Sequence, residues 1–235
     1  MKLSNYYKKQ NLFPNREKAF FEDGSSDVAI YGATGTGCHR AIEKHIAELL
    51  QYGTNHVYIY ADKTAIRTFY EDFAVNGRVH LCDISSIGIK TPELQEEPGF
   101  TKGDMAHIFI DLYNIPITEK TFSNLKTFME NKKGKELNEI RTYICNRYNN
   151  ATSCFAEKAD AVVLFYLDED SLYNFSRHYS PVKYLKKMYW LFFLEFAMRK
   201  KGRLSKGKTR VFFRINNKKA PFFATKKIRL FENGR

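Results

Sequence analysis

The sequence predicts an α/β fold in which a doubly wound parallel sheet carries helices on both faces. Short apolar runs alternate with amphipathic runs along most of the chain, which is typical of repeated strand–helix–strand units. The first apolar run, residues 28–31, meets a glycine cluster (GATGTG), and a helical run follows without a break. The chain has 235 residues, of which 43% are hydrophobic, and this suits one domain with a sizeable core.

The individual elements follow from the spacing of apolar residues and from turn signals between them. We expect strands at residues 28–31, 56–60, 78–84, 106–112, 159–166 and 209–215. We expect helices at residues 39–52, 65–73, 118–131, 135–157 and 179–201. Residues 1–26 are polar and aromatic, and are expected to form an extension ahead of a domain at residues 27–235.

The formal charge of +12 favours an anionic partner. The interleaved basic and aromatic residues near the C-terminus also suit nucleic acid, although an acidic protein partner is preferred here. Four scattered cysteines without a CxxC pair indicate free thiols in a reducing compartment and no zinc site. Because the chain shows neither a signal peptide nor an apolar run long enough for a membrane span, we expect a cytoplasmic protein.

The glycine cluster admits two interpretations, and the first is a P-loop. Gly32 and Gly37 have the spacing of the GxxxxGK[ST] pattern. However, Cys38 stands in the place of the lysine and His39 in the place of the serine or threonine. Those two residues hold the β/γ-phosphates and Mg²⁺ in that motif. Asp111, at the end of the fourth expected strand, is a candidate for the acidic partner of such a site.

The second interpretation is a dinucleotide turn. GATG, followed by a long helix that opens with Tyr179 and Lys183, resembles the short-chain dehydrogenase/reductase family and its Rossmann-type fold. Residues four apart share one helix face, so the ammonium would lie beside the phenol. A neighbouring positive charge lowers the pKa of a tyrosine, which makes it a usable proton donor at neutral pH.

The resemblance extends to other positions in the same order. It implies catalytic roles for Tyr179, Lys183, Asn138 (in the helix before the fifth strand) and Tyr166. It implies a site for NADP or NAD formed by Gly32, Thr34, Gly35, Gly37, Asp62, Lys63, Asp83 and Ile84. Asp62 would bind a ribose, although it could also serve as the N-cap of the next helix.

The chain departs from that family in three places. Cys38 lies where the third glycine of the turn is expected, and Tyr166 and Leu167 lie where the catalytic serine is expected. The chain also ends soon after the sixth expected strand, so the family's C-terminal region would be shortened. The catalytic tetrad is therefore incomplete, with Tyr166 as the substitute for the serine.

The resemblance implies a carbonyl reductase similar to 3-oxoacyl-(acyl-carrier-protein) reductases. Tyr179 would donate the proton and Lys183 would activate it, with an acyl-carrier protein as the acidic partner. The aromatic face of residues 179–201 would form a homo- or hetero-dimer. Two alternatives stay open: a catalytically impaired paralogue that serves as a scaffold or partner subunit, and a degenerate P-loop ATPase that binds DNA.

Overall fold

The computed structural model describes residues 26–51, 55–92, 105–131, 138–179, 208–215 and 222–229. Its strands are β1 (Ser26–Tyr31), β2 (Asn55–Ala61), β3 (Val79–Asp83), β4 (Met105–Asp111), β5 (Asn138–Cys145), β6 (Ala161–Leu164), β7 (Lys208–Ile215) and β8 (Phe222–Arg229). Its helices are α2 (Cys38–Leu49), α3 (Lys63–Ala65), α4 (Glu119–Asn131), α5 (Ser153–Lys158) and α6 (Glu169–Tyr179). A π-helical turn (Ile66–Tyr70) and a 3-10 turn (Glu71–Val75) continue α3.

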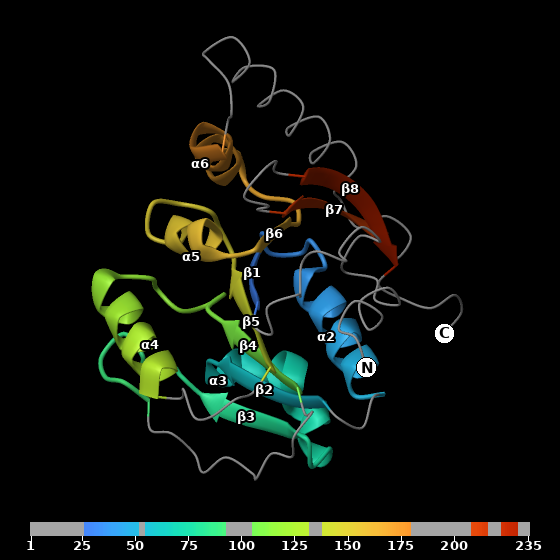
Figure 1. Cartoon of the computed structure of the whole chain (residues 1–235), viewed down its shortest axis with the longest axis vertical. Helices are drawn as coiled ribbons and strands as arrows, with labels where there is room; N and C mark the ends of the chain where they lie inside the picture. The colour runs from blue at the N-terminus through green and yellow to red at the C-terminus, as the bar shows by residue number, and fades with distance from the viewer. Residues whose placement is uncertain are drawn as a thin grey trace.

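All eight strands form one sheet in the order β3-β2-β4-β5-β1-β6-β7-β8. The six strands from β3 to β6 are parallel to their neighbours, and β7 and β8 are antiparallel. Figure 1 shows α2 against one face of this sheet and α4 and α5 against the other. The predicted fold class, an α/β doubly wound parallel sheet with helices on both faces, is therefore confirmed.

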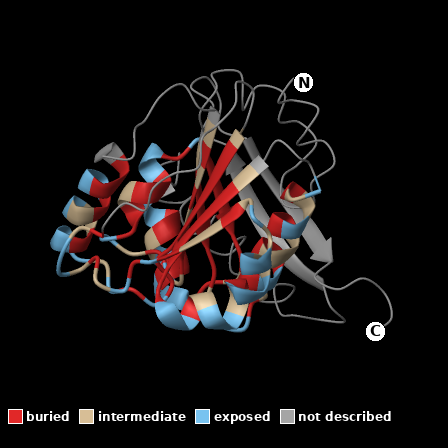
Figure 2. Cartoon of the chain, turned by 90° about the horizontal axis from the view of Figure 1, so that it is seen from below, coloured by how far each residue is buried: buried red, intermediate tan, exposed pale blue. Residues whose placement is uncertain are grey.

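The two faces of the sheet bury separate apolar clusters because successive side chains of a strand point to opposite sides. Val28 and Ile30 of β1 pack in the cluster that includes Ile42 and Ile46 of α2. Ala29 and Tyr31 pack in the cluster of α4, α5 and α6. The central strands are buried along most of their length, and the helices turn their exposed residues outward (Figure 2).

Strand β5 is the main departure from the sequence-based expectation, which assigned residues 135–157 to one helix. The segment instead forms β5 and, after a loop, the short helix α5. β5 lies between β4 and β1, and Ser26 is paired with Ile140. In a dinucleotide-binding fold the order 3-2-1-4-5-6 puts the first strand beside the second. Here the neighbours of β1 are β5 and β6, so the strand order is not that of a dinucleotide-binding fold.

The C-terminal part of the chain also differs from the prediction. Helix α6 was not anticipated, and the helix expected at residues 179–201 lies outside the described residues except for Tyr179, the last residue of α6. The strand expected at 209–215 is present as β7, but it pairs antiparallel with β6 and with the unanticipated β8. No helix among the described residues is long and apolar enough to cross a membrane. The expected extension at residues 1–26 lies, apart from Ser26, outside the described part.

Candidate phosphate-binding site

The glycine turn joins the end of β1 to the start of α2 at the carboxyl edge of the sheet. The N–H of Gly32 donates to the carbonyl of Cys145 at 3.0 Å, and the N–H of Ala33 donates to the carbonyl of Tyr166 at 2.8 Å. These two bonds attach the turn to the end of β5 on one side and to the segment after β6 on the other. The turn is therefore held in place before any ligand arrives.

The three glycines of the turn are explained by two different structural requirements. Gly35 and Gly37 have φ angles of 77° and 82°, in the left-handed region that side chains disfavour. Gly32 approaches its neighbours closely: a Cβ there would lie 2.9 Å from the Cβ of Phe165 and 3.0 Å from the Cβ of Cys38. The turn thus needs glycine at all three positions.

The turn presents backbone N–H groups at the N-terminus of α2. The first N–H groups of a helix have no partner within it, and they carry the positive end of the helix dipole. The N-cap is Gly37, which has no side chain to accept a hydrogen bond from them. Thr34 and Gly35 are exposed at the tip of the turn. This arrangement suits an anion such as a phosphate group.

A buried carboxylate, Asp111, lies beside this turn at the end of β4. Its Oδ2 accepts a hydrogen bond from Nε2 of His39 at 2.9 Å and another from the hydroxyl of Tyr70 at 2.8 Å. Its Oδ1 accepts from the backbone N–H of Tyr113 at 3.0 Å. The carboxylate is fully buried, and each of its two oxygens accepts at least one hydrogen bond from the protein.

The His39 imidazole is fixed by rings as well as by Asp111. It stacks on Phe69 with ring centroids 4.0 Å apart and meets the edge of Tyr113 at 4.6 Å. The Tyr113 hydroxyl in turn donates to the hydroxyl of Thr34 at 3.2 Å, which connects the cluster to the exposed tip of the turn. Burial, followed by the proximity of Asp111, raises the pKa of Tyr70 well above its ordinary value, so this phenol stays protonated.

The P-loop pattern implies Mg²⁺, and the residues present do not fit that ion. Mg²⁺ prefers oxygen ligands in near-octahedral geometry. The hydroxyl expected at position 39 is replaced by an imidazole, and the carboxylate of Asp111 is already engaged on both oxygens. Among the described residues no cluster of three or more His, Cys, Asp or Glu side chains could hold a metal. The site therefore resembles a P-loop whose metal position is closed by side chains.

Cys38 occupies the place of the P-loop lysine and cannot take over its role. Its side chain is buried, and burial, followed by Asp111 and Cys145, raises the pKa of the thiol well above its ordinary value. A thiol in this state is neutral and a poor nucleophile. It packs as an apolar side chain in the cluster that contains Ile42 and Phe165.

The acids predicted to bind the cofactor have structural roles instead. Oδ1 of Asp62 accepts from the N–H groups of Thr64 at 2.7 Å and Ala65 at 3.2 Å, which makes Asp62 the N-cap of α3. Its other oxygen accepts from the side-chain amide of Asn114 at 3.0 Å.

Asp83 is the second predicted acid, and it contacts two neighbouring residues. Its Oδ1 accepts a hydrogen bond from the backbone N–H of Ser85, and its Oδ2 lies 3.8 Å from the ammonium nitrogen of Lys63. The following residue, Ile84, is fully buried.

Two of the residues predicted to be catalytic, Asn138 and Tyr166, lie at opposite edges of the sheet. Asn138 opens β5, so it lies in a strand at the amino edge of the sheet rather than in a helix. Tyr166 follows β6 at the opposite, carboxyl edge, where its carbonyl accepts from the N–H of Ala33. Tyr179 ends α6, and Lys183 lies outside the described residues.

The aromatic part of the site is absent from the sequence-based predictions. It consists of Phe69, Tyr70 and Tyr113, each of which contacts His39, Asp111 or both. Of these three residues, Tyr113 could have been predicted to lie near the site, because it follows Asp111 by two residues at the end of a buried strand. Tyr70 lies in the short helical segment after β2, and nothing in its local sequence indicates that it reaches Asp111.

No family model matches the chain, and no curated protein matches it. Among solved structures, it is similar to the genome packaging NTPase B204 from Sulfolobus turreted icosahedral virus 2 in complex with ATPγS, at 12% identity, with 86% of this chain and 97% of that chain covered and a TM-score of 0.46. It is similar to B204, the DNA-packaging ATPase from Sulfolobus turreted icosahedral virus, at 14% identity, with 84% and 96% covered and a TM-score of 0.47. It is also similar to the pCW3 conjugation coupling protein TcpA with ATPγS, at 11% identity, with 88% and 60% covered and a TM-score of 0.49.

The resemblance to short-chain dehydrogenase/reductases is wrong. The strand order gives the physical reason, because β1 lacks the neighbours that a dinucleotide site requires. The NADP or NAD cofactor, the reductase activity and the proton-donor and activator roles of Tyr179 and Lys183 fall with it. So does the impaired-reductase alternative, and nothing supports an acyl-carrier partner.

Proposed function

We propose that the chain binds a nucleoside di- or triphosphate through the backbone of the glycine turn, in a degenerate P-loop site. One observation carries the proposal. The turn at residues 32–37 and the carboxylate of Asp111 lie at the same edge of the sheet and are joined through His39 of α2. A phosphate at the turn would therefore lie beside the first turn of α2, where N–H groups and the helix dipole favour negative charge.

The conformation of the turn supports phosphate binding rather than a merely structural turn. Gly35 is exposed, has a positive φ, and would place an added Cβ in open space. An ordinary residue could occupy that space but would be strained by the backbone, so the position favours glycine for its conformation. Successive N–H groups in such a conformation form an anion-binding concavity.

The same residues support binding without efficient hydrolysis. The lysine that contacts the β/γ-phosphates is replaced by the buried, neutral Cys38, and the Mg²⁺ ligand is replaced by His39. Phosphoryl transfer depends on positive charge placed around the transferred group, and neither replacement supplies it in the P-loop manner. We therefore expect affinity to come from backbone N–H groups and to be independent of magnesium.

Isothermal titration with ATP, ADP, AMP and NADH, each with magnesium and with EDTA, tests this proposal. We expect saturable binding of ADP and ATP that EDTA changes less than about threefold, and weaker binding of AMP. Gly35→Ala should weaken ADP binding, because it strains the turn and adds a methyl group where the phosphate would lie. Gly77→Ala is the matched control, since its added Cβ meets nothing within 4 Å and its φ is ordinary. Absence of nucleotide binding at millimolar concentration would refute the proposal.

DNA binding is a second candidate function, favoured by the excess of 38 basic over 26 acidic residues. We expect any such binding to weaken steeply with salt, since neutralised phosphates release counterions. A fluorescence-anisotropy titration of labelled duplex DNA at 50 and 200 mM salt measures this slope. Binding that is insensitive to salt, or no binding at 50 mM, would remove the candidate.

A further inference from the structure

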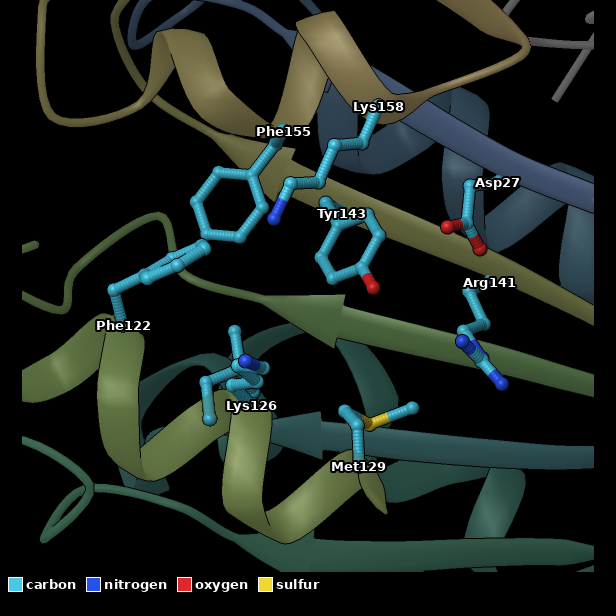
Figure 3. Close-up of a pocket in the computed structure, with 9 residues that line it drawn as sticks. Asp27, Phe122, Lys126, Met129, Arg141, Tyr143, Phe155 and Lys158 are labelled. Carbon is cyan, nitrogen blue, oxygen red and sulfur yellow. The ribbon is translucent and has the colours of Figure 1, made fainter. Parts of the chain in front are cut away.

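A second concave site lies on the face of the sheet opposite to α2. It is a cavity of about 190 Å³ between α4 and α5, with β5 as its floor (Figure 3). It is lined by Asp27, Phe122, Leu125, Lys126, Met129, Arg141, Tyr143, Phe155 and Lys158. None of these residues belongs to the glycine turn or to the Asp111 cluster, so the cavity is separate from the proposed phosphate site.

Strand β5 contributes two large polar residues to the lining of the cavity, Arg141 and Tyr143. Ile140 and Ile144 point to the other face, where they join the cluster of α2. The residues between them, Arg141 and Tyr143, point toward α4 and α5 by the alternation of a strand. Both remain partly exposed.

Three aromatic rings form one end of the cavity. Tyr143 and Phe155 stack with ring centroids 4.9 Å apart and an interplanar angle of 23°. Phe122 from α4 approaches Phe155 at 5.8 Å, so rings from both helices and from the strand converge (Figure 3). Leu125 and Met129 continue the apolar wall along α4. Such a wall favours a flat apolar body.

The lining carries three cations, Lys126, Arg141 and Lys158, and one anion, Asp27, which is a net charge of +2. Glu139, outside the lining, pairs with Arg141 at 2.8 Å and reduces the local excess to one positive charge. The ammonium of Lys158 lies 5.0 Å from the centroid of the Phe122 ring, at the aromatic end. A monoanion thus matches the electrostatics better than a dianionic phosphate ester does.

We propose that this cavity binds a small aromatic monocarboxylate of one ring, with the ring against Phe122, Tyr143 and Phe155 and the carboxylate toward Lys126 and Lys158. The volume agrees with this class, since a cavity of roughly 150 Å³ accepts benzene. Burial, followed by the charge of Asp27, raises the pKa of Tyr143, so its hydroxyl stays protonated and can donate to the ligand.

Ligand-detected NMR and isothermal titration with benzoate and 4-hydroxybenzoate test the proposal on the full chain. Benzamide serves as the neutral comparison and cyclohexanecarboxylate as the non-aromatic one. We expect saturable binding of both benzoates, at least about tenfold weaker binding of benzamide, and weaker binding of cyclohexanecarboxylate. Saturation that is absent up to 10 mM, or equal affinity for benzoate and benzamide, would overturn the proposal.

Variants identify the cavity as the place of binding. Lys126→Gln combined with Lys158→Gln changes two exposed residues and should reduce benzoate affinity about tenfold or more. Lys120→Gln, on the exposed surface of α4 and outside the lining, is the matched control and should have no effect. Unchanged binding by the double variant would contradict the proposal.

Two further measurements distinguish this cavity from the glycine turn and its proposed ligand from an oligonucleotide. Nucleotide binding at the glycine turn should be the same in the double variant, so failure of one site does not imply failure of the other. A single-stranded oligonucleotide is the rival occupant of an aromatic and basic cavity. If it competes for the cavity while benzoates do not bind, the monocarboxylate proposal is wrong.

Discussion

The imidazole of His39 donates to the carboxylate of Asp111 across 2.9 Å, and it does so at the position where a P-loop would hold its metal ion. His39 belongs to the first turn of α2, and Asp111 ends β4, two strands away from β1 in the sheet. The contact therefore connects α2, the helix that follows the glycine turn, to the carboxyl end of β4, where the acidic residue of a P-loop site is expected. The position that binds the metal ion in the P-loop motif therefore forms a hydrogen bond within this protein.

Removing the carboxylate should destabilise the fold strongly. Asp111→Ala leaves His39, Tyr70 and the N–H of Tyr113 without their buried acceptor, and we expect a loss of about 3 kcal/mol in the free energy of unfolding. Tyr70→Phe removes one of these bonds and should cost about 1.5 kcal/mol. Urea denaturation measures both. Equal losses from the two variants would show that the network does not converge on Asp111.

Placing the two residues of the P-loop motif at positions 38 and 39 should make nucleotide binding depend on magnesium. In Cys38→Lys combined with His39→Thr, the ammonium can contact the distal phosphates, and Asp111 loses the imidazole that occupies Oδ2. We expect ATP to bind at least about tenfold more tightly with magnesium than with EDTA, measured by titration.

Each single variant serves as a control for that gain. His39→Thr alone frees the carboxylate without adding the ammonium, and Cys38→Lys alone adds a charge while the imidazole still occupies Asp111. A magnesium effect as large in either single variant as in the double variant would contradict the assignment of the two positions.

Glycine at position 32 should be required for close packing. Gly32→Ala places a Cβ 2.9 Å from the Cβ of Phe165 and 3.2 Å from the hydroxyl of Thr36, so the turn must shift. We expect a loss of about 2 kcal/mol in the free energy of unfolding, as for other overpacked sites. Gly77→Ala, in open space, should change stability by less than about 0.5 kcal/mol in the same denaturation experiment.

Two buried histidines should make the protein sensitive to mild acid. Burial lowers the pKa of His45 to about 3, and burial, followed by His45, lowers the pKa of His107 to about 3. Because the unfolded chain binds these protons near pH 6.5, stability is fully present above that pH and falls as pH drops toward 3. At pH 5 the loss is about 2 kcal/mol for each histidine.

Denaturation at pH 7, 6 and 5 measures this loss. The variant His45→Gln should have a smaller decrease between pH 7 and pH 5 than the unaltered chain, whatever its stability at pH 7. A decrease of unchanged size would show that His45 does not carry the effect.

Most of the fold could be predicted from sequence, because buried parallel strands read as short apolar runs. The strands at residues 28–31, 56–60 and 106–112 were expected within one or two residues of β1, β2 and β4. β5 was missed because Arg141 and Tyr143 interrupt its apolar character and its surroundings favour helix. Its alternation with Ile140, Thr142 and Ile144 was nevertheless a strand signal.

The error at β5 also decided the error in function. Without a strand between β4 and β1, the sequence was compatible with a dinucleotide-binding fold. In that fold Tyr179 and Lys183 were predicted to be the proton donor and its activator. The glycine turn itself was located correctly, because its glycines are needed by local backbone geometry. The Asp111 cluster was only partly foreseen, since contacts between His39, Tyr70 and Tyr113 depend on which strands are neighbours and not on local sequence.

The position of β5 beside β1 affects how the chain folds during translation. Among the described strands β1 is the first to leave the ribosome, yet Ser26 is paired with Ile140 and Val28 with Ala161. The middle of the sheet therefore stays open until the last parallel strand has been synthesised, while β2, β3 and β4 can already associate. Nascent chains of this topology expose an apolar strand during most of translation, so their yield in cells should depend on chaperones and on elongation speed.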